Sequence, residues 1–231
     1  MGSAAVQPCE YNFPYTDPAS FTALSAIIEN VGVSAYLGAA GSISNAAYLT
    51  AAGSILTTEA RHQAWVSAAV NKNEGWSGPY DTPVGFNVVY SAVTPFFVSC
   101  PASNPALPFK AFPALTYDAA TGAVTGASDG QYIALYQGLD IATYPIQGGK
   151  VQLPTTQGTA YITATSEKNA TLVGDANIVA GREYYRKSLS QAKLTTPLSS
   201  RRHLEPLQVQ RREPRSWIHL RRLNGYLSSE F

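Results

Sequence analysis

Apolar residues recur at helical spacing in a first stretch near the start of the chain. Asp17, Pro18 and Ser20 are typical of a helix start, and apolar side chains then stand three or four positions apart from Phe21 to Ala35. Glycines at 38 and 41 end the pattern. We therefore predict a long helix that begins near residue 17.

A second helical stretch follows after a short connection. It begins between Ser42 and Asn45, and one line of residues falls within an arc of about 100° on its surface. That line consists of Tyr48, Ala52, Ile55, Glu59, His62, Val66 and Ala69. The short connection predicts an antiparallel pair of helices.

A shorter third helix is predicted after the turn-rich residues 71–79. Thr82, with Pro83 behind it, has the preferences of an N-cap and a first helical position, and apolar residues continue from Phe86 toward Cys100. Four prolines in residues 101–114 then predict an extended linker. Residues 9–100 thus form the helical part of the chain.

The spacing of apolar residues changes to that of strands in residues 115–180. Asp129-Gly130 and Gly148-Gly149 are turn dipeptides typical of hairpins. The residues around them are β-branched and aromatic, with candidate strands at 132–136, 142–146 and 161–165. We predict an α+β fold, in which a small antiparallel β module follows the helices and residues 182–231 form a disordered, basic tail.

The total net charge of +1 conceals two different parts. Residues 1–181 hold 5 Lys and Arg against 11 Asp and Glu, a net charge of −6, whereas residues 182–231 hold 11 against 4, a net charge of +7. The acidic body is a poor surface for nucleic acid, which is bound by clustered cations. Apolar stretches are interrupted by Gly, Ser, Asn and Pro, so we expect no transmembrane segment.

Two cysteines and one glycosylation sequon indicate the cellular compartment in which the protein folds. Cys9 and Cys100 are too far apart in sequence for a zinc knuckle or a redox pair, and they can form one disulfide or remain two buried thiols. Asn169 begins the only Asn-x-Ser/Thr sequon. Both features are compatible with an extracellular protein, although the first residues do not have the pattern of a secretory signal.

Three residues of the two long helices are candidate metal ligands. Glu29 is the only charged residue between positions 18 and 58, and Glu59 and His62 follow in the middle of the second helix's apolar arc. Residues three apart on a helix point to one location, so Glu59 and His62 can bind the same ion, and Glu29 can supply a second carboxylate. Alternatively, the carboxylates hydrogen-bond to Tyr36, Tyr48, His62 or buried water and only fix the helix register.

Four segments of the helical part share a further feature: CEYNFPY at 9–15, ENVGVSAYLG at 29–38, YLTAAGSIL at 48–56 and EARH at 59–62. They resemble a fungal ferritin-like family whose members are described as stress-response, desiccation-related or late sexual development proteins. The resemblance runs from about Cys9 to Ala180 and includes NPALP at 104–108 and the β-rich end. It implies an incomplete ferritin-like bundle, because the first helix pair and its ligands have no counterpart here. A truncated coding region would explain this departure and the unusual tail.

The resemblance also implies a function. Intact members are secreted or cell-wall proteins, and the fold holds a pair of iron or manganese ions that could oxidise Fe(II) or consume peroxide. This chain carries Glu29, Glu59 and His62, which are half of such a ligand set, so a homodimer would have to complete the site. Whether the chain is an enzyme stays undecided from its sequence. Two alternatives remain: a non-catalytic wall protein whose residues 115–180 bind polysaccharide, and a non-functional fragment.

Overall fold

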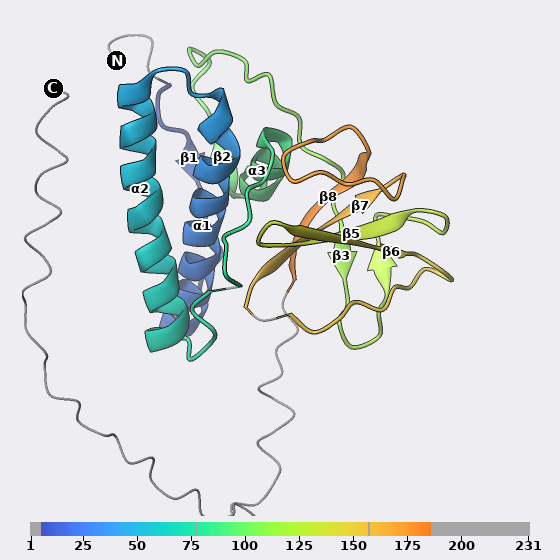
Figure 1. Ribbon diagram of the computed structural model, residues 1–231. Coiled ribbons are helices and arrows are strands. Elements are labelled where there is room, and N and C mark those ends of the chain that lie inside the picture. The colour runs from blue at the N-terminus through green and yellow to red at the C-terminus, as the bar shows by residue number, and fades with distance from the viewer. Residues whose placement is uncertain (1–5, 77, 157, 186–231) are drawn as a thin grey trace, which may run out of the picture. The chain divides into compact units, whose positions relative to one another are not determined.

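A computed structural model describes residues 6–76, 78–156 and 158–185 of the chain. The described residues belong to one compact unit, in which the α-helices precede the main sheet along the chain (Figure 1). The α-helices are α1 (Pro18–Ala39), α2 (Ala46–Trp65) and α3 (Phe86–Val93), and short helical turns are η2 (Ala40–Ser42), η3 (Val66–Val70) and η4 (Thr94–Phe96). The strands are β1 (Glu10–Tyr11), β2 (Phe97–Ser99), β3 (Thr116–Tyr117), β4 (Val124–Thr125), β5 (Tyr132–Gln137), β6 (Asp140–Pro145), β7 (Ala160–Thr165) and β8 (Ile178–Tyr185). The α+β class predicted from the sequence is confirmed.

The two long helices start at the residues that the sequence indicated. Asp17 caps α1 in a capping box, in which its Oδ1 accepts from Ser20 N–H at 2.8 Å and its own N–H donates to Ser20 Oγ at 3.1 Å. Asn45 caps α2, because its Oδ1 accepts from the backbone N–H of Ala47 and of Tyr48. The short turn η2 joins the helices, and they pack side by side along their length.

The third helix begins later than predicted, because Thr82 is engaged elsewhere. The Thr82 hydroxyl accepts a hydrogen bond from Gly138 N–H at 2.7 Å, in the turn between β5 and β6. Val84 N–H donates to the Ser34 carbonyl of α1 at 3.2 Å. These bonds hold the segment in an extended form, so α3 starts only after Gly85.

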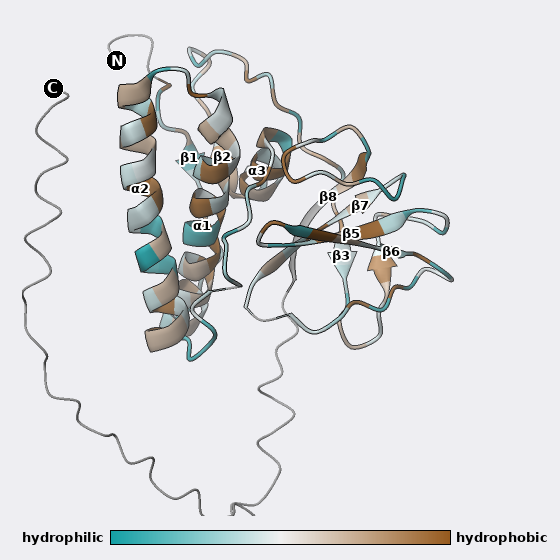
Figure 2. Cartoon of the chain, viewed as in Figure 1, coloured by the Kyte–Doolittle hydropathy of each residue, from teal (hydrophilic) through white to brown (hydrophobic). Residues whose placement is uncertain are grey.

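The main sheet is antiparallel, with the strand order β6-β5-β7-β8. Its central strand β7 is buried along its whole length, since apolar clusters cover both faces. One cluster includes Leu115, Ile133 and Ile162, and the other joins Tyr136 and Tyr161 to Val84 and Val88 at α3. Figure 2 shows strongly hydrophobic colour on part of β5, whereas hydrophobic and hydrophilic residues alternate along the helices.

The two predicted turn dipeptides are turns, but neither connects β5 to β6. Gly148-Gly149 closes a two-residue hairpin in which Gln147 and Lys150 exchange backbone hydrogen bonds. Asp129 accepts from both Gly148 N–H and Gly149 N–H at 2.8 Å, which ties the two turn regions together. The β5–β6 turn uses Gly138, whose φ of 63° favours glycine.

Strand β8 extends the β-rich part beyond residue 180. Its register pairs Ala160 with Tyr185 and Ile162 with Glu183, so four residues assigned to the tail belong to the sheet. The charged residues in this stretch broke the apolar pattern, whereas a strand ladder is held by backbone groups that all residues except proline share. The remainder of the predicted basic tail, residues 186–231, lies outside the described residues.

Helix α1 and its extension through η2 are apolar enough to qualify as a membrane span. By length and composition alone, residues 18–42, with a mean hydropathy of 1.3, pass that test, in contrast to the expectation from the interrupted sequence. The core helix of a soluble protein passes the same test. In this fold α1 packs against α2 and α3.

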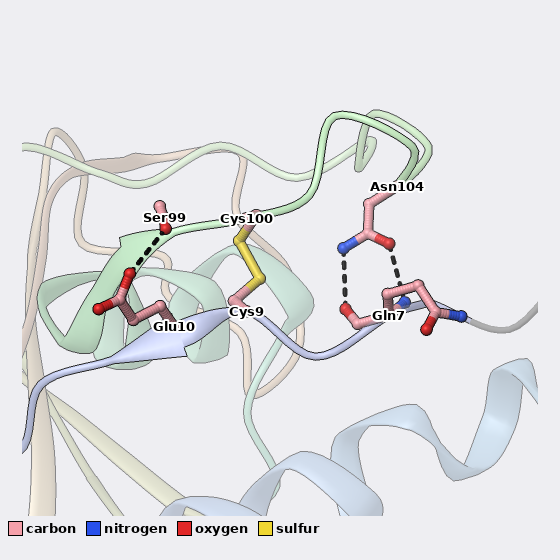
Figure 3. Close-up of a disulfide and its surroundings, with 6 residues drawn as sticks. All are labelled: Gln7, Cys9, Glu10, Ser99, Cys100 and Asn104. Atoms are coloured by element: carbon pink, nitrogen blue, oxygen red, sulfur yellow. Dashed lines mark hydrogen bonds between the residues drawn. A yellow bond between two sulfur atoms is a disulfide. The ribbon is translucent and has the colours of Figure 1, made fainter.

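A disulfide fastens residues 7–15, which we call the N-terminal strap. It joins Cys9 to Cys100 with a Cα–Cα distance of 4.2 Å, beside the β1–β2 pair (Figure 3). The backbone of Gln7 exchanges two hydrogen bonds with the Asn104 side chain, and Ser99 donates to Glu10 at 3.1 Å. These contacts place the aromatic residues of the strap against the region after α3.

Candidate functional site

The three predicted ligands lie on facing helices, and two of them are in contact. Glu29 Oε1 on α1 lies 3.3 Å from His62 Nδ1 on α2. The His62 side chain is 59% exposed and that of Glu29 is 29% exposed. The helix hairpin therefore brings together residues that are 33 positions apart in sequence.

Glu59 is the most constrained member of this group. Its Oε2 is shielded from solvent and has no hydrogen-bond partner. Burial raises the pKa of Glu59, the negative charge of Glu29 raises it further, and His62 acts in the opposite direction. The site thus contains a carboxylate that is poorly stabilised in its charged form.

Gly32 makes the position of Glu59 possible. A Cβ at residue 32 would overlap all three atoms of the Glu59 carboxylate group, so only glycine leaves this space on α1. This role of Gly32 was not predicted from the sequence. The signal was present only as a glycine three positions after Glu29 inside an otherwise good helix.

The predicted apolar arc of α2 is more exposed than we expected. His62 was placed on a core-facing line, but it is largely accessible, and Tyr48 and Ile55 on the same line are 64% and 44% exposed. The reason is that α1 is the main element packed against α2, and it covers only part of the helix surface. Ala52 of the arc is buried as predicted.

The donor set has the chemistry of a metal site but is incomplete. Carboxylate oxygens and an imidazole nitrogen suit iron and manganese. Within the described ranges, however, no group of three or more His, Cys, Asp or Glu residues is arranged to hold a metal ion. The carboxylates and the imidazole fit such an ion by type, and further ligands would have to join them.

An apolar groove lies beside Glu59, and we call it the aromatic groove. It has a volume of about 310 Å³ and is formed by the strap, α1, α2 and the end of α3. It is lined by Tyr11, Phe13, Ile28, Val31, Gly32, Ala35, Glu59, Val89, Val93, Phe96 and Phe97. The rings of Tyr11 and Phe97 lie 5.5 Å apart, and those of Phe13 and Phe96 lie 5.4 Å apart.

A larger cavity of about 760 Å³ lies between the first part of α1 and η3 with the residues that follow it. Its lining includes Pro18, Thr22, Ser67 and Asn71 but no titratable or aromatic side chain. Size alone would favour it, yet chemistry requires groups that can bind or transfer charge. The aromatic groove, which contains a carboxylate and aromatic rings, is therefore the better candidate for a binding site.

The two cysteines and the sequon asparagine are the other residues singled out in the sequence. Cys9 and Cys100 form the disulfide that fastens the strap. Asn169 of the sequon is exposed between β7 and β8, and its carbonyl accepts from the Asn177 side chain at 3.1 Å. Neither lies among the residues of the carboxylate site or of the aromatic groove.

Comparison with known families bears on the helical part. A family model described as a ferritin-like domain matches residues 1–72, which include both long helices and all three candidate ligands. The match supports a ferritin-like family for the N-terminal part of the chain. A search of curated proteins finds no match.

Proposed function

We propose that the ferritin-like N-terminal part of this chain contributes half of a carboxylate and histidine site for iron or manganese. Glu29, Glu59 and His62 would hold the metal, and a bound ion would supply redox chemistry for metal handling or defence against oxidants. The family match to residues 1–72 supports this proposal because ligands in such bundles project inward from facing helices.

The unpartnered Glu59 Oε2 is the observation that carries the proposal. A buried carboxylate without a partner is costly, and proteins stabilise such groups by pairing or by metal coordination. Glu29 adds negative charge beside it, and the Glu29–His62 contact places a nitrogen donor within the same group. A divalent cation would compensate the charge and use both donor types.

A second copy of the chain is the source that we propose for the missing ligands. The helix pair exposes large apolar side chains, among them Phe21, Ile28, Tyr48, Leu49 and Ile55. Exposed apolar surface of this kind marks interaction sites. A symmetric dimer would bury such residues and would place a second Glu29, Glu59 and His62 opposite the first set.

Metal analysis with matched variants tests the proposal. After incubation with Mn(II) or anaerobic Fe(II) and removal of free ions, we expect bound metal in the wild type and almost none in Glu59→Gln or His62→Ala. Glu167→Gln, which changes an exposed glutamate near β7, serves as the control and should bind like the wild type. Equal binding by all four proteins, or no binding by the wild type, would overturn the proposal.

We also propose that the protein works outside the cell or in the cell wall, as a stress-response member of the fungal ferritin-like family. The disulfide supports an oxidising compartment, and the exposed Asn169 is accessible for glycosylation. Secretion from a eukaryotic host should add a glycan that glycosidase removes and that Asn169→Gln lacks. Secreted protein without this mass difference would contradict the glycosylation part of the proposal.

A further inference from the structure

The aromatic groove has one charged residue in its lining, and this residue is Glu59. The other ten lining residues are apolar, aromatic or glycine. Small-molecule sites commonly combine an apolar lining with a few polar groups that fix the orientation of the ligand. A volume of about 310 Å³ is sufficient for one aromatic ring with a short side chain.

The carboxylate lies at the wall formed by α1. Its Oε2 is shielded from solvent, occupies the space that Gly32 leaves free, and has no hydrogen-bond partner. Gly32 and Glu59 both line the groove, so a ligand within it lies beside the Glu59 side chain. The groove thus has a largely apolar lining and a single carboxylate at one wall.

The negative charge beside the groove determines which ligand charge is favoured. No lysine or arginine lines the groove, and the charge of Glu29 adds to that of Glu59. An anionic ligand would be repelled, and a neutral hydroxyl would gain only an ordinary hydrogen bond. A cation gains a charge-assisted hydrogen bond, which is about twice as strong.

The aromatic walls favour the same ligand. Tyr11, Phe13, Phe96 and Phe97 contribute rings to the groove, and their centroids lie 5.4 to 6.0 Å from one another in successive pairs. Such rings pack well against an apolar or aromatic ligand body. Their negative faces also attract an ammonium group.

We propose that the aromatic groove binds a protonated primary amine that carries an aromatic or alkyl body. The ammonium group donates to the carboxylate of Glu59, and the body packs among Tyr11, Phe13, Phe96 and Phe97. This binding requires no metal ion, so it goes beyond the metal site proposed above. Amine and metal share Glu59 and therefore compete.

Calorimetric titration of the metal-free full chain tests this inference with three probes of similar size. In the presence of a chelator, we expect 2-phenylethylamine to bind about tenfold more tightly than 2-phenylethanol, the difference of one charge-assisted bond. The anion 3-phenylpropionate should bind most weakly. Equal affinities for amine and alcohol, or no binding by the amine, would overturn the inference.

Variants then locate the binding. Glu59→Gln should weaken the amine about tenfold and change the alcohol less than about twofold, because only the ammonium uses the charge. Phe97→Leu should weaken both probes, since it removes a wall. If circular dichroism shows that Glu59→Gln does not fold, the relative affinities of the three probes for the wild type still test the inference. Unchanged amine binding by a folded Glu59→Gln protein would place the ligand elsewhere and overturn the inference.

His62→Ala separates this inference from the metal proposal. His62 does not line the groove, so this variant should lose metal and keep the preference for amine over alcohol. Amine selectivity in a wild type that binds no metal would overturn only the metal proposal. Metal binding without amine selectivity would overturn only the amine inference.

Discussion

At the scale of single residues, the carboxylate of Glu59 depends on a neighbour that has no side chain. Gly32 provides the space in which this carboxylate lies, and no described side chain or backbone group donates a hydrogen bond to its Oε2. The unpartnered carboxylate is therefore well suited to bind a ligand, but it lowers the stability of the folded chain. Active sites often show this opposition.

Gly32→Ala separates the two effects. Alanine in a helix interior is better than glycine by about 1 kcal/mol, and the flexible Glu59 side chain can move away from the new methyl group. We expect equal or higher stability in urea denaturation, together with loss of metal and amine binding. Gly53→Ala on α2 is the control, since nothing lies within 4 Å of a Cβ there, and it should gain stability without any change in binding.

The raised pKa of Glu59 predicts a pH effect on the metal-free protein. At pH values between the ordinary glutamate pKa of 4.5 and the raised pKa of Glu59 in the folded chain, the folded chain holds more protons than the unfolded chain. The free energy of unfolding therefore falls as the pH rises through this window. In Glu59→Gln, the free energy of unfolding should fall less over this pH range. The variant should therefore be more stable than the wild type near neutral pH.

Urea denaturation at about pH 4.5 and about pH 7, with a chelator present, measures this difference. Burial also raises the pKa of Asp81 and of Asp175, but both residues are common to the two proteins, so their effects cancel in the comparison. The same decline in wild type and variant would contradict the assignment to Glu59.

At the scale of elements, a buried tyrosine of the sheet hydrogen-bonds to α1. The Tyr161 hydroxyl of β7 lies 2.6 Å from Ser34 Oγ and 3.0 Å from the Asn30 carbonyl, and it also donates to the Asn30 side chain. All three residues are buried. This contact fixes the part of α1 that holds Glu29, Gly32 and the groove.

Tyr161→Phe should destabilise the protein by about 1–3 kcal/mol, the cost of leaving buried polar groups without their partner. Thermal or urea denaturation measures it, and Tyr144→Phe on β6 is the control for loss of a hydroxyl elsewhere in the sheet. A change in Tyr161→Phe no larger than in Tyr144→Phe would show that this contact is not important for stability.

The disulfide also connects elements that are distant in sequence. It closes a loop of 91 residues, and a chain link of this length contributes about 2–4 kcal/mol. The double variant Cys9→Ser/Cys100→Ser should lose stability in this range and should bind both groove probes more weakly, because Tyr11 and Phe13 lie on the released strap. Unchanged probe binding would show that the strap is held by its other contacts.

The sequence predicted those elements whose signals are local. Asp17 and Asn45 are N-caps because their own side chains bond to the next turn, and the sequence alone is sufficient to place them. Thr82 looked like the same kind of residue, but its hydroxyl bonds to Gly138, which is 56 positions away. The late start of α3, the extension of β8, the role of Tyr161 and the aromatic groove all depend on such long-range contacts.

At the scale of the whole molecule, the candidate functional residues all lie in the acidic part of the sequence and none in its basic end. Residues 1–181, with a net charge of −6, contain the ferritin-like match, the carboxylate site and the groove. The described helices also expose large apolar residues beside half a ligand set. These two observations support the proposed metal-linked dimer.

The mass of the protein in solution should respond to metal. Chromatography with light scattering should give a dimer with Mn(II) or Fe(II), and weaker association after chelation, because a cation removes the repulsion between facing carboxylates. Glu59→Gln should not respond to the metal. A monomer under all conditions would exclude the dimer as the source of the missing ligands.

Anomalous diffraction from crystals grown with Mn(II) tests the metal site most directly. We expect an anomalous peak within coordination distance of Glu29, Glu59 and His62, with ligands from the partner copy completing the ion's shell. A well-ordered structure in which these three side chains have no anomalous peak among them, at a metal concentration that saturates binding in solution, would contradict the proposed function.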